Sequence, residues 1–189
     1  HTKLTLVTYF SIWVIAVVMI GALEWNGAFG DLTSNERVLA SLFQGTTPRS
    51  SGLSTVDIGA MSEGTWFVMD ILMFIGAGSA GTGGGIKVTT FAVLILAIIA
   101  EARGDRDTEA FGKRIPSDVH RLAISATFLG AFLVGIATLA ILNLSNQPLS
   151  RVLFEVISAF ATVGLSTGIT AELPSTAQLI LVILMYLGR

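Results

Sequence analysis

A glycine-rich stretch between two apolar segments has the residue types of a phosphate-binding loop. It runs from Gly76 to Lys87 and contains Gly-x-Gly-x-x-Gly, a pattern that brings backbone N–H groups close to a dinucleotide. A Walker loop, however, needs glycine directly before its lysine and serine or threonine directly after it, and Ile86 and Val88 occupy those places. A dinucleotide turn also follows a strand, whereas apolar segments suited to a bilayer flank this stretch. Nucleotide binding is therefore disfavoured, and two interpretations remain: close packing of membrane helices on glycine, or a membrane helix broken to form a gate.

A second motif, Gly-Leu-Ser-Thr, occurs twice, at 52–55 and at 164–167. Each copy follows a short apolar segment and precedes a polar turn. A short helix that enters a membrane carries a partial negative charge at its carboxyl end, which favours a cation. Extended residues after such a helix can turn their carbonyl oxygens to one side, where these replace the water around a potassium ion, and glycine permits the unusual dihedral angles. The stretches 50–53 and 162–165 are thus predicted to bind a cation through backbone oxygens.

The composition places the chain in a membrane class. Of its 189 residues, 52% are hydrophobic and only 13% are charged, and the mean hydropathy is +0.77. A net charge of −2 argues against a nucleic-acid partner, and the absence of cysteine removes disulfides, thiolate metal sites and cysteine nucleophiles. The two histidines, His1 and His120, belong to no metal-ligand or catalytic pattern. We therefore predict neither an enzyme nor a cofactor.

Two uncharged segments, Leu4–Leu23 and Leu122–Leu142, are long enough to cross the roughly 30 Å apolar core of a bilayer as helices. The stretch 66–100 is too long for one straight crossing, and we expect one crossing broken in the middle by the glycines. Leu173–Arg189 begins a further span. Because the chain begins without methionine and stops within an apolar segment, we expect a fragment of a longer protein.

Two shorter apolar segments, Val38–Phe43 and Val152–Phe160, cannot cross a bilayer and are predicted to be re-entrant half-helices. Arginine and lysine are concentrated in the 101–121 loop, which the positive-inside rule places in the cytoplasm. Both half-helices then enter from the outside. The predicted fold is an all-α membrane protein made of two span–pore-helix–span repeats, with units at 1–104 and 122–189 and a cytoplasmic linker at 105–121.

Four segments, TTPRSSGLST, GAGSAGTGGGIKVTTF, EVISAFATVGLSTGIT and MYLGR, resemble in this order the Trk/Ktr/HKT superfamily of potassium transporters. The bacterial KtrB-type membrane subunit is the most similar kind. The resemblance implies four repeats around one pore, of which this chain would supply the third and fourth. The third filter of the family usually reads Arg-Thr-Ala-Gly-Phe, whereas here Ser50, Ser51 and Leu53 replace Thr, Ala and Phe, so the resemblance implies the backbone role and not the side-chain detail.

The resemblance also implies roles for individual residues. Glycines of the broken span would form an intramembrane gate below the filter, and Arg189 would reach toward that gate. For Lys87, gating and simple anchoring at a membrane interface stay open. The implied potassium filter is Ser50, Ser51, Gly52, Leu53, Thr162, Val163, Gly164 and Leu165; the implied gate is Gly76, Gly78, Gly81, Gly83, Gly84, Gly85, Lys87 and Arg189.

For several charged residues near these segments, a structural role is a simpler interpretation than ion binding. Glu155 and Arg49 are expected to hold the half-helices by hydrogen bonds, and Asp57 and Glu172 to be solvated loop charges. Asp70 is a candidate partner for Lys87 or Arg189, because a cation within a membrane usually pairs or faces a cavity.

Family membership would further imply a multi-pass protein of the bacterial plasma membrane. It would be a homodimer seated on a cytoplasmic ring of nucleotide-binding regulatory subunits, in contact with the lipid bilayer and with no nucleic acid. The transported ion would be K+, and transport of Na+ stays open. The alternative function is a membrane scaffold or assembly subunit without a pore of its own.

Overall fold

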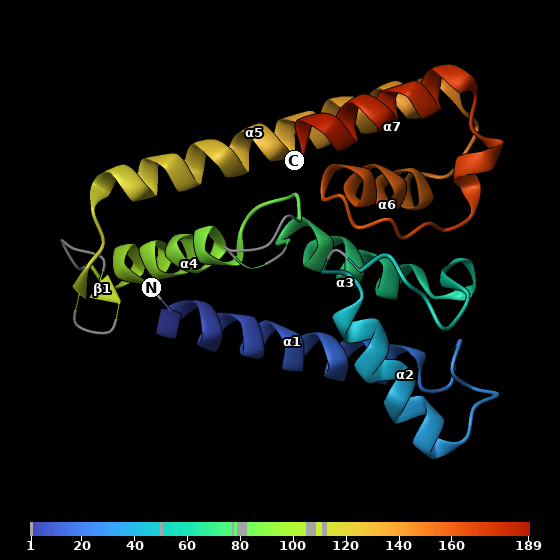
Figure 1. Ribbon diagram of the computed structural model, residues 1–189, viewed down its shortest axis with the longest axis horizontal. Coiled ribbons are helices and arrows are strands. Elements are labelled where there is room, and N and C mark those ends of the chain that lie inside the picture. Colours follow the sequence, from blue (N-terminus) through green and yellow to red (C-terminus); the bar gives the residue numbers. More distant parts are fainter. Residues whose placement is uncertain (1, 50, 77, 79–82, 105–108, 111–112) are drawn as a thin grey trace.

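A computed structural model describes residues 2–49, 51–76, 78, 83–104, 109–110 and 113–189 (Figure 1). Within these ranges the regular elements are helices, apart from one short two-stranded ladder. The elements are α1 (Thr2–Glu24), α2 (Ser34–Thr46), a 3₁₀ turn η1 (Ile58–Ala60), α3 (Glu63–Phe74), α4 (Val88–Arg103), β1 (Glu109–Ala110), β2 (Lys113–Arg114), α5 (Ser117–Leu144), α6 (Leu149–Phe160), η2 (Ile169–Glu172) and α7 (Ser175–Leu187).

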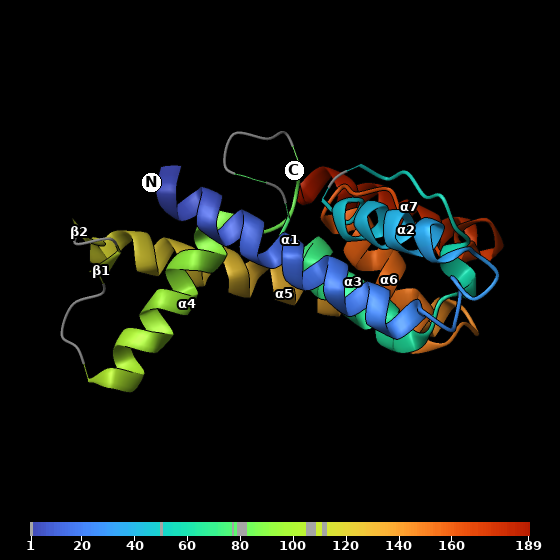
Figure 2. The same cartoon turned by 90° about the horizontal axis from the view of Figure 1, so that it is seen from below.

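The order of elements in the first half of the chain recurs in the second. A long helix is followed by a short helix, an irregular segment with Gly-Leu-Ser-Thr, a 3₁₀ turn and another helix, first from α1 to α3 and then from α5 to α7. In Figure 1, α5 and α7 lie side by side along one edge and α1 lies along the other, with α3 and α4 between them. Figure 2 shows the same arrangement from below, with α2 and α6 gathered at one end of the molecule.

The helix lengths agree with the spans expected from the sequence. In the part of the chain that the structure describes, Lys3–Glu24 and Asp118–Leu144 are each long and apolar enough to cross a membrane. The short helices α2 and α6, at about 1.5 Å per residue, reach only about 20 Å and cannot cross. The expected break is also present, since α3 ends at Phe74 and α4 begins at Val88.

Two details differ from the sequence-based expectation. Residues Glu109–Ala110 and Lys113–Arg114 pair as a short antiparallel ladder, so the all-α prediction is wrong for these few linker residues. Helix α5 begins at Ser117, inside the linker predicted at 105–121, because Pro116 precedes it. Proline lacks an N–H group, which costs nothing at a helix start, where N–H groups have no intrahelical partner.

Local sequence signals also explain where the other short helices begin. Pro148 and Pro174 stand directly before α6 and α7, as Pro116 does before α5. At α2 the signal is a capping box, in which the Glu36 carboxylate accepts hydrogen bonds from the N–H and hydroxyl of Thr33, both at 2.8 Å. Both bonds lower the pKa of Glu36, and the bond from the Thr33 backbone N–H has the larger effect.

A buried carboxylate joins the first helix to the broken one. Glu24, only 1% exposed, accepts hydrogen bonds from Ala28 N, Ser62 N, Ser62 Oγ and Thr65 Oγ1. The bonds tie the end of α1 to the first turn of α3, where N–H groups need acceptors. Glu24 therefore helps to fix the position of α3 relative to α1.

Replacing Glu24 with alanine is expected to destabilise the protein by roughly 2–4 kcal/mol, because several buried donors would lose their acceptor. This effect is measured by heating the protein in detergent and monitoring unfolding as the loss of its monodisperse peak. The matched control is Asp31→Ala, which removes an exposed carboxylate and should change stability by less than about 0.5 kcal/mol. Equal effects of the two substitutions would show that Glu24 does not hold α3.

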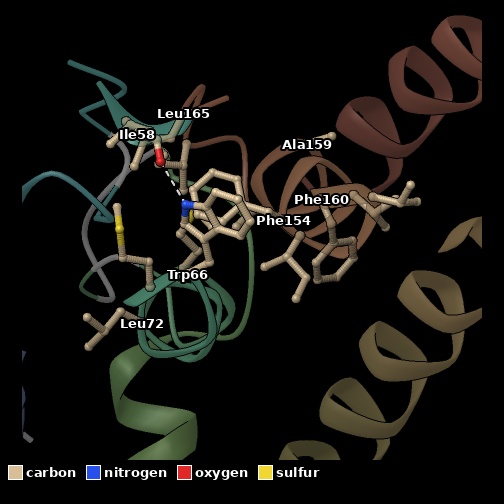
Figure 3. Packing of buried hydrophobic residues seen from close by; sticks show 14 of the residues in the cluster. Ile58, Trp66, Leu72, Phe154, Ala159, Phe160 and Leu165 are labelled. Atoms are coloured by element: carbon tan, nitrogen blue, oxygen red, sulfur yellow. Dashed lines mark hydrogen bonds between the residues drawn. The ribbon is translucent and has the colours of Figure 1, made fainter. Parts of the chain in front are cut away.

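The apolar core includes the contact between α3 and α6 and extends to the irregular segment after α6. Figure 3 shows the Trp66 indole N–H pointing at Ile58 O, a hydrogen bond of 2.7 Å, with Phe154 and Leu165 close by. Phe74, the last residue of α3, stacks on Phe160, with ring centroids 6.1 Å apart. Because Leu165 belongs to this core, the core fixes the segment in which the second Gly-Leu-Ser-Thr motif lies.

Candidate functional site

The two Gly-Leu-Ser-Thr segments lie against each other, although they are far apart in sequence. A methyl carbon built on Gly52 would be 2.5 Å from Val163 O and 3.5 Å from Gly164 Cα. Figures 1 and 2 show the coils that follow α2 and α6 passing side by side. Gly52 and Gly164 have φ angles of +64° and +91°, in the left-handed region that favours glycine. Both central glycines of the predicted filter thus occupy equivalent positions and face one another.

The segment after α6 is held closely to its own helix. Val163 N donates to Ser158 O at 3.0 Å, and the Ser158 hydroxyl donates to Leu165 O at 2.6 Å. The side chains of Val163 and Leu165 are buried. Since Leu165 O is engaged by α6, the carbonyl groups nearer to Thr162 are the better candidates for cation ligands within 162–165.

A polar side chain on each short helix holds the serine of the neighbouring motif. On α6, Glu155 Oε1 accepts a bond of 2.7 Å from the Ser166 hydroxyl, and on α2, Gln44 Nε2 donates one of 3.1 Å to the Ser54 hydroxyl. Both Gln44 and Glu155 are at least 95% buried. The expected structural role of Glu155 is therefore present, whereas the equivalent role of Gln44 was not predicted; only its place on the short helix could have indicated it.

The segment after α2 is less enclosed. Ser51 N donates to Thr47 O at 3.3 Å, and the Leu53 side chain is 65% exposed, in contrast to the buried Leu165. Ser50 lies outside the described residues. The two segments therefore share a left-handed φ at the central glycine and differ in how firmly the surroundings hold them.

Arg49 does not act as the expected hydrogen-bonding residue. Its Nη1 and Nη2 atoms are buried without a hydrogen-bond partner among the described residues, and its guanidinium lies 4.0 Å from the centroid of the Tyr9 ring. A guanidinium is attracted to the face of an aromatic ring, so this contact joins the end of α2 to α1. The two loop carboxylates form hydrogen bonds with other loop residues. Asp57 accepts a hydrogen bond from Gly59 N, and Glu172 accepts one from the Gln147 amide.

The glycine-rich stretch reaches the 162–165 segment at Thr162. Gly84 N donates to Thr162 Oγ1 at 2.8 Å, and Gly85 N donates to Gly188 O at 3.3 Å. Ile86 N donates to Phe74 O at 3.0 Å, which holds the stretch against the end of α3. In both Figure 1 and Figure 2, the loop before α4 meets the end of α7. Gly84, one of the predicted gate glycines, thus contacts Thr162, the first residue of the 162–165 segment, directly.

The other predicted gate residues have more varied positions. Gly76 and Gly83 are buried, Gly78 is half-buried, and Gly81 lies outside the described residues. Lys87 Nζ donates to Gly83 O at 2.8 Å, so this cation braces the loop itself. Asp70 is buried, and its Oδ1 has no hydrogen-bond partner in the described ranges, so the suggested pairing with Lys87 or Arg189 is not seen there.

The contact between α7 and the loop is made by backbone rather than by a charged side chain. Arg189 is exposed, and the neighbouring Gly188 accepts the bond from Gly85 N. A methyl carbon on Gly188 would lie only 1.9 Å from Phe160 O, so no larger residue fits without moving α6 or α7. The sequence did not predict this role of Gly188, because a glycine near the end of an apolar segment is also typical of an ordinary helix end.

The ligands that this region offers are neutral oxygen atoms. Carbonyl and hydroxyl oxygens surround the contact between the two segments and the loop, and no group of three or more His, Cys, Asp or Glu residues suited to a metal ion occurs in the described part of the chain. Neutral oxygens can replace the hydration shell of a monovalent cation.

Comparison with known proteins identifies similarity to cation transport proteins along the whole chain. A family model described as "TrkH: Cation transport protein" matches residues 1–189. Over the whole chain, the sequence is 40% identical to Ktr system potassium uptake protein B and 41% identical to Ktr system potassium uptake protein D, both of Bacillus subtilis strain 168. It is 36% identical to Ktr system potassium uptake protein B of Vibrio alginolyticus. The chain spans 42–43% of the length of these three relatives.

Proposed function

The chain belongs to the TrkH family of cation transport proteins, and we propose that it supplies half of the ion-conducting core of a potassium uptake transporter. Similar proteins over its whole length are named potassium uptake proteins. K+ is accordingly the proposed ion, and the protein is proposed to cross the bacterial plasma membrane several times. The proposed activity is transport rather than catalysis.

The observation that carries this proposal is the direct contact between the two Gly-Leu-Ser-Thr segments. Gly52 and Gly164 both adopt left-handed φ angles and lie within van der Waals reach of one another. Each segment follows a short helix whose carboxyl end points toward the segment and carries a partial negative charge. We propose that backbone oxygens of 50–53 and 162–165 line the ion path, with Leu165 O the one most engaged by its own helix.

The proposed pore needs more protein than this chain. Two segments cannot surround an ion, and in the family architecture two further repeats complete the ring. We propose α2 and α6 as re-entrant pore helices of the third and fourth repeats, within units 1–104 and 122–189. A homodimer on a cytoplasmic ring of nucleotide-binding subunits is the proposed assembly, with the 105–121 linker on the cytoplasmic side.

Ion flux tests this proposal. The purified transporter that contains this chain is reconstituted in liposomes, and uptake of ⁸⁶Rb+ or K+ is compared with uptake of Na+. Selective K+ uptake is expected. A non-conducting scaffold would give no flux above that of empty liposomes, and an unselective leak would also overturn the assignment of 50–53 and 162–165 as a filter.

The glycine-rich stretch is proposed to obstruct the path below the filter, because Gly84 is bonded to Thr162 at its inner end. Deleting residues 79–82 should shorten the obstruction and raise K+ flux by about tenfold, the effect of weakening the closed state by roughly 1.4 kcal/mol. Initial rates of ⁸⁶Rb+ uptake measure this change.

The matched control deletes residues 105–108, a segment of the same length in the proposed cytoplasmic linker. This deletion should leave the uptake rate per folded protein nearly unchanged. Unchanged or reduced flux after deletion of 79–82, in protein that still elutes as a monodisperse peak, would show that the stretch does not obstruct the pathway.

A further inference from the structure

Asp70 is a buried carboxyl group that the proposed filter and gate do not use. In the part of the chain that the structure describes, three carboxyl side chains are buried: Glu24, Asp70 and Glu155 are 1%, 5% and 5% exposed. Glu24 and Glu155 each accept four hydrogen bonds from N–H and O–H groups, and such bonds stabilise a charged carboxylate. Asp70 differs, because its Oδ1 atom is buried without a hydrogen-bond partner among the described residues.

Asp70 lies on the face of α3 that packs against α6. Trp66 stands one turn before it and Phe74 one turn after it, and residues four apart share one face of a helix. The Arg151 guanidinium lies 5.6 Å from the centroid of a Trp66 ring, and the Phe74 ring stacks on that of Phe160. Because both neighbours contact α6, the carboxyl between them is enclosed by α3 and α6.

Charged groups on α6 and at the two ends of α3 are engaged elsewhere. On α6, Arg151 lies over the Trp66 ring, and Glu155 accepts bonds from the segment that follows its own helix. At the start of α3, Glu63 accepts a hydrogen bond from a serine hydroxyl of α6. Beyond the end of α3, Lys87 donates to a carbonyl group of its own loop.

Helices α1 and α5 likewise bring no described counter-charge to Asp70. On α1, which also packs against α3, Glu24 is bonded to the first turn of α3, Tyr9 contacts the guanidinium that follows α2, and Lys3 lies at the opposite end from Glu24. Helix α5 reaches the end of α3 at Gly130. The charged and titratable residues of α5 all lie in its first turns, at Asp118, His120 and Arg121.

The second unit of the chain has an apolar residue at the equivalent place. Helices α3 and α7 both begin 11 residues after the central glycine of the preceding segment, at Glu63 and Ser175. Asp70 and Val182 both follow that glycine by 18 residues. Since a valine serves at this place in one unit, helix packing by itself does not call for a carboxyl group in the other.

A carboxyl group in these surroundings is far more stable with a proton than without one. An isolated charge in apolar surroundings is costly, and such a group takes up a proton and becomes neutral instead. A charge within a membrane is costly for the same reason. We infer that Asp70 is a proton-binding site between α3 and α6, and that its proton is bound while these helices pack as they do here.

Loss of the proton would place a single negative charge in the contact between α3 and α6. Water or a cation would have to enter to stabilise that charge, and its entry separates the two helices. Leu165 belongs to the apolar core that includes this contact, so movement of α6 would reach the 162–165 segment. Lower K+ uptake at alkaline pH is then expected; this consequence rests on the proposed function, whereas the proton site itself does not.

Infrared spectroscopy of the purified transporter that contains this chain tests for the proton directly. At neutral pH the parent is expected to show the C=O stretch of a protonated carboxylic acid, which shifts in D₂O and is absent from the Asp70→Asn variant. Asparagine is close in size to the protonated acid and is also neutral, so it should preserve the packing. Asp70→Val, which copies Val182, is a second variant in which the same band should be missing.

The matched control is Asp31→Asn, because Asp31 is an exposed aspartate. This substitution should remove a carboxylate band and leave the carboxylic acid band in place. The inference is overturned if the substitutions at Asp70 also remove a carboxylate band, since Asp70 would then be ionised and stabilised by water or by a cation.

The pH dependence of stability gives a second readout. The unfolded chain releases the Asp70 proton at neutral pH, whereas the folded protein keeps it, so stability falls as the pH rises. Between about pH 7 and about pH 10, the midpoint of thermal unfolding of the parent should fall by about 2 °C more than that of Asp70→Asn. An equal fall in both proteins would show that the bound proton does not support the packing of α3 on α6.

Uptake of ⁸⁶Rb+ separates failure of this inference from failure of the proposed function. Over the same pH range, the uptake rate of the parent should fall by about fivefold more than that of Asp70→Asn. The carboxylic acid band without any uptake at neutral pH leaves the proton site intact and removes the proposed function. Selective uptake without the carboxylic acid band removes the proton site alone.

Discussion

Replacing Gly52 with alanine is expected to reduce selective K+ flux by roughly tenfold or more. The left-handed φ of +64° strains any L-residue by about 1–3 kcal/mol, and the added Cβ would lie 2.5 Å from Val163 O. Relief of this clash must move one of the two segments away from the other. Uptake of K+ and of Na+ into liposomes measures the loss of rate and of selectivity.

Gly64→Ala is the matched control, because a Cβ there would come no nearer than 3.9 Å to another residue, at Ser62 Oγ, and it lies in the first turn of α3. It should leave flux and selectivity unchanged. Gly164→Ala provides an intermediate case: its φ is +91°, but the added carbon would reach only Gly52 Cα, at 3.7 Å. If Gly52→Ala retained the K+ selectivity of the parent, the proposed contribution of 50–53 to the filter would be wrong.

Replacing Glu155 with alanine is expected to destabilise the protein by roughly 3–5 kcal/mol. The buried carboxylate accepts bonds from Ser166 Oγ, Thr167 N, Thr167 Oγ1 and Thr170 Oγ1. Its removal leaves these donors without an acceptor and frees the segment that follows Leu165. Heating the protein in detergent and measuring the fraction that stays monodisperse gives the stability, and K+ flux gives the effect on the proposed filter.

Two further variants separate the role of the hydrogen bonds from that of the side-chain volume. Glu155→Gln keeps a carbonyl oxygen for Ser166 and Thr167, while its amide can donate to the Thr170 hydroxyl, so a smaller loss of stability is expected. Glu172→Ala removes an exposed carboxylate that accepts a hydrogen bond from Gln147 and should cost less than about 1 kcal/mol. An alanine variant at 155 as stable as that at 172 would contradict the holding role.

The sequence alone was sufficient for the two long apolar helices, the two short helices and the break between α3 and α4. These features depend on local quantities: the length of uncharged runs such as Leu4–Leu23, and glycine concentrated at 76–85 between apolar flanks. An apolar run of a given length either reaches across a bilayer or does not, and helix geometry decides which. The repeated Gly-Leu-Ser-Thr motif likewise indicated that 52 and 164 are equivalent, and the structure places these glycines against each other.

Only the tertiary structure decided which atoms meet. Nothing local to Gly188 indicates that its backbone contacts Phe160 and the glycine loop, because that contact depends on how α6 and α7 approach each other. For the same reason Arg49 was expected to form hydrogen bonds and instead lies over the Tyr9 ring. Residue type sets what a group can bind, but the partner is fixed by packing between segments distant in sequence, and one sequence carries no direct record of that packing.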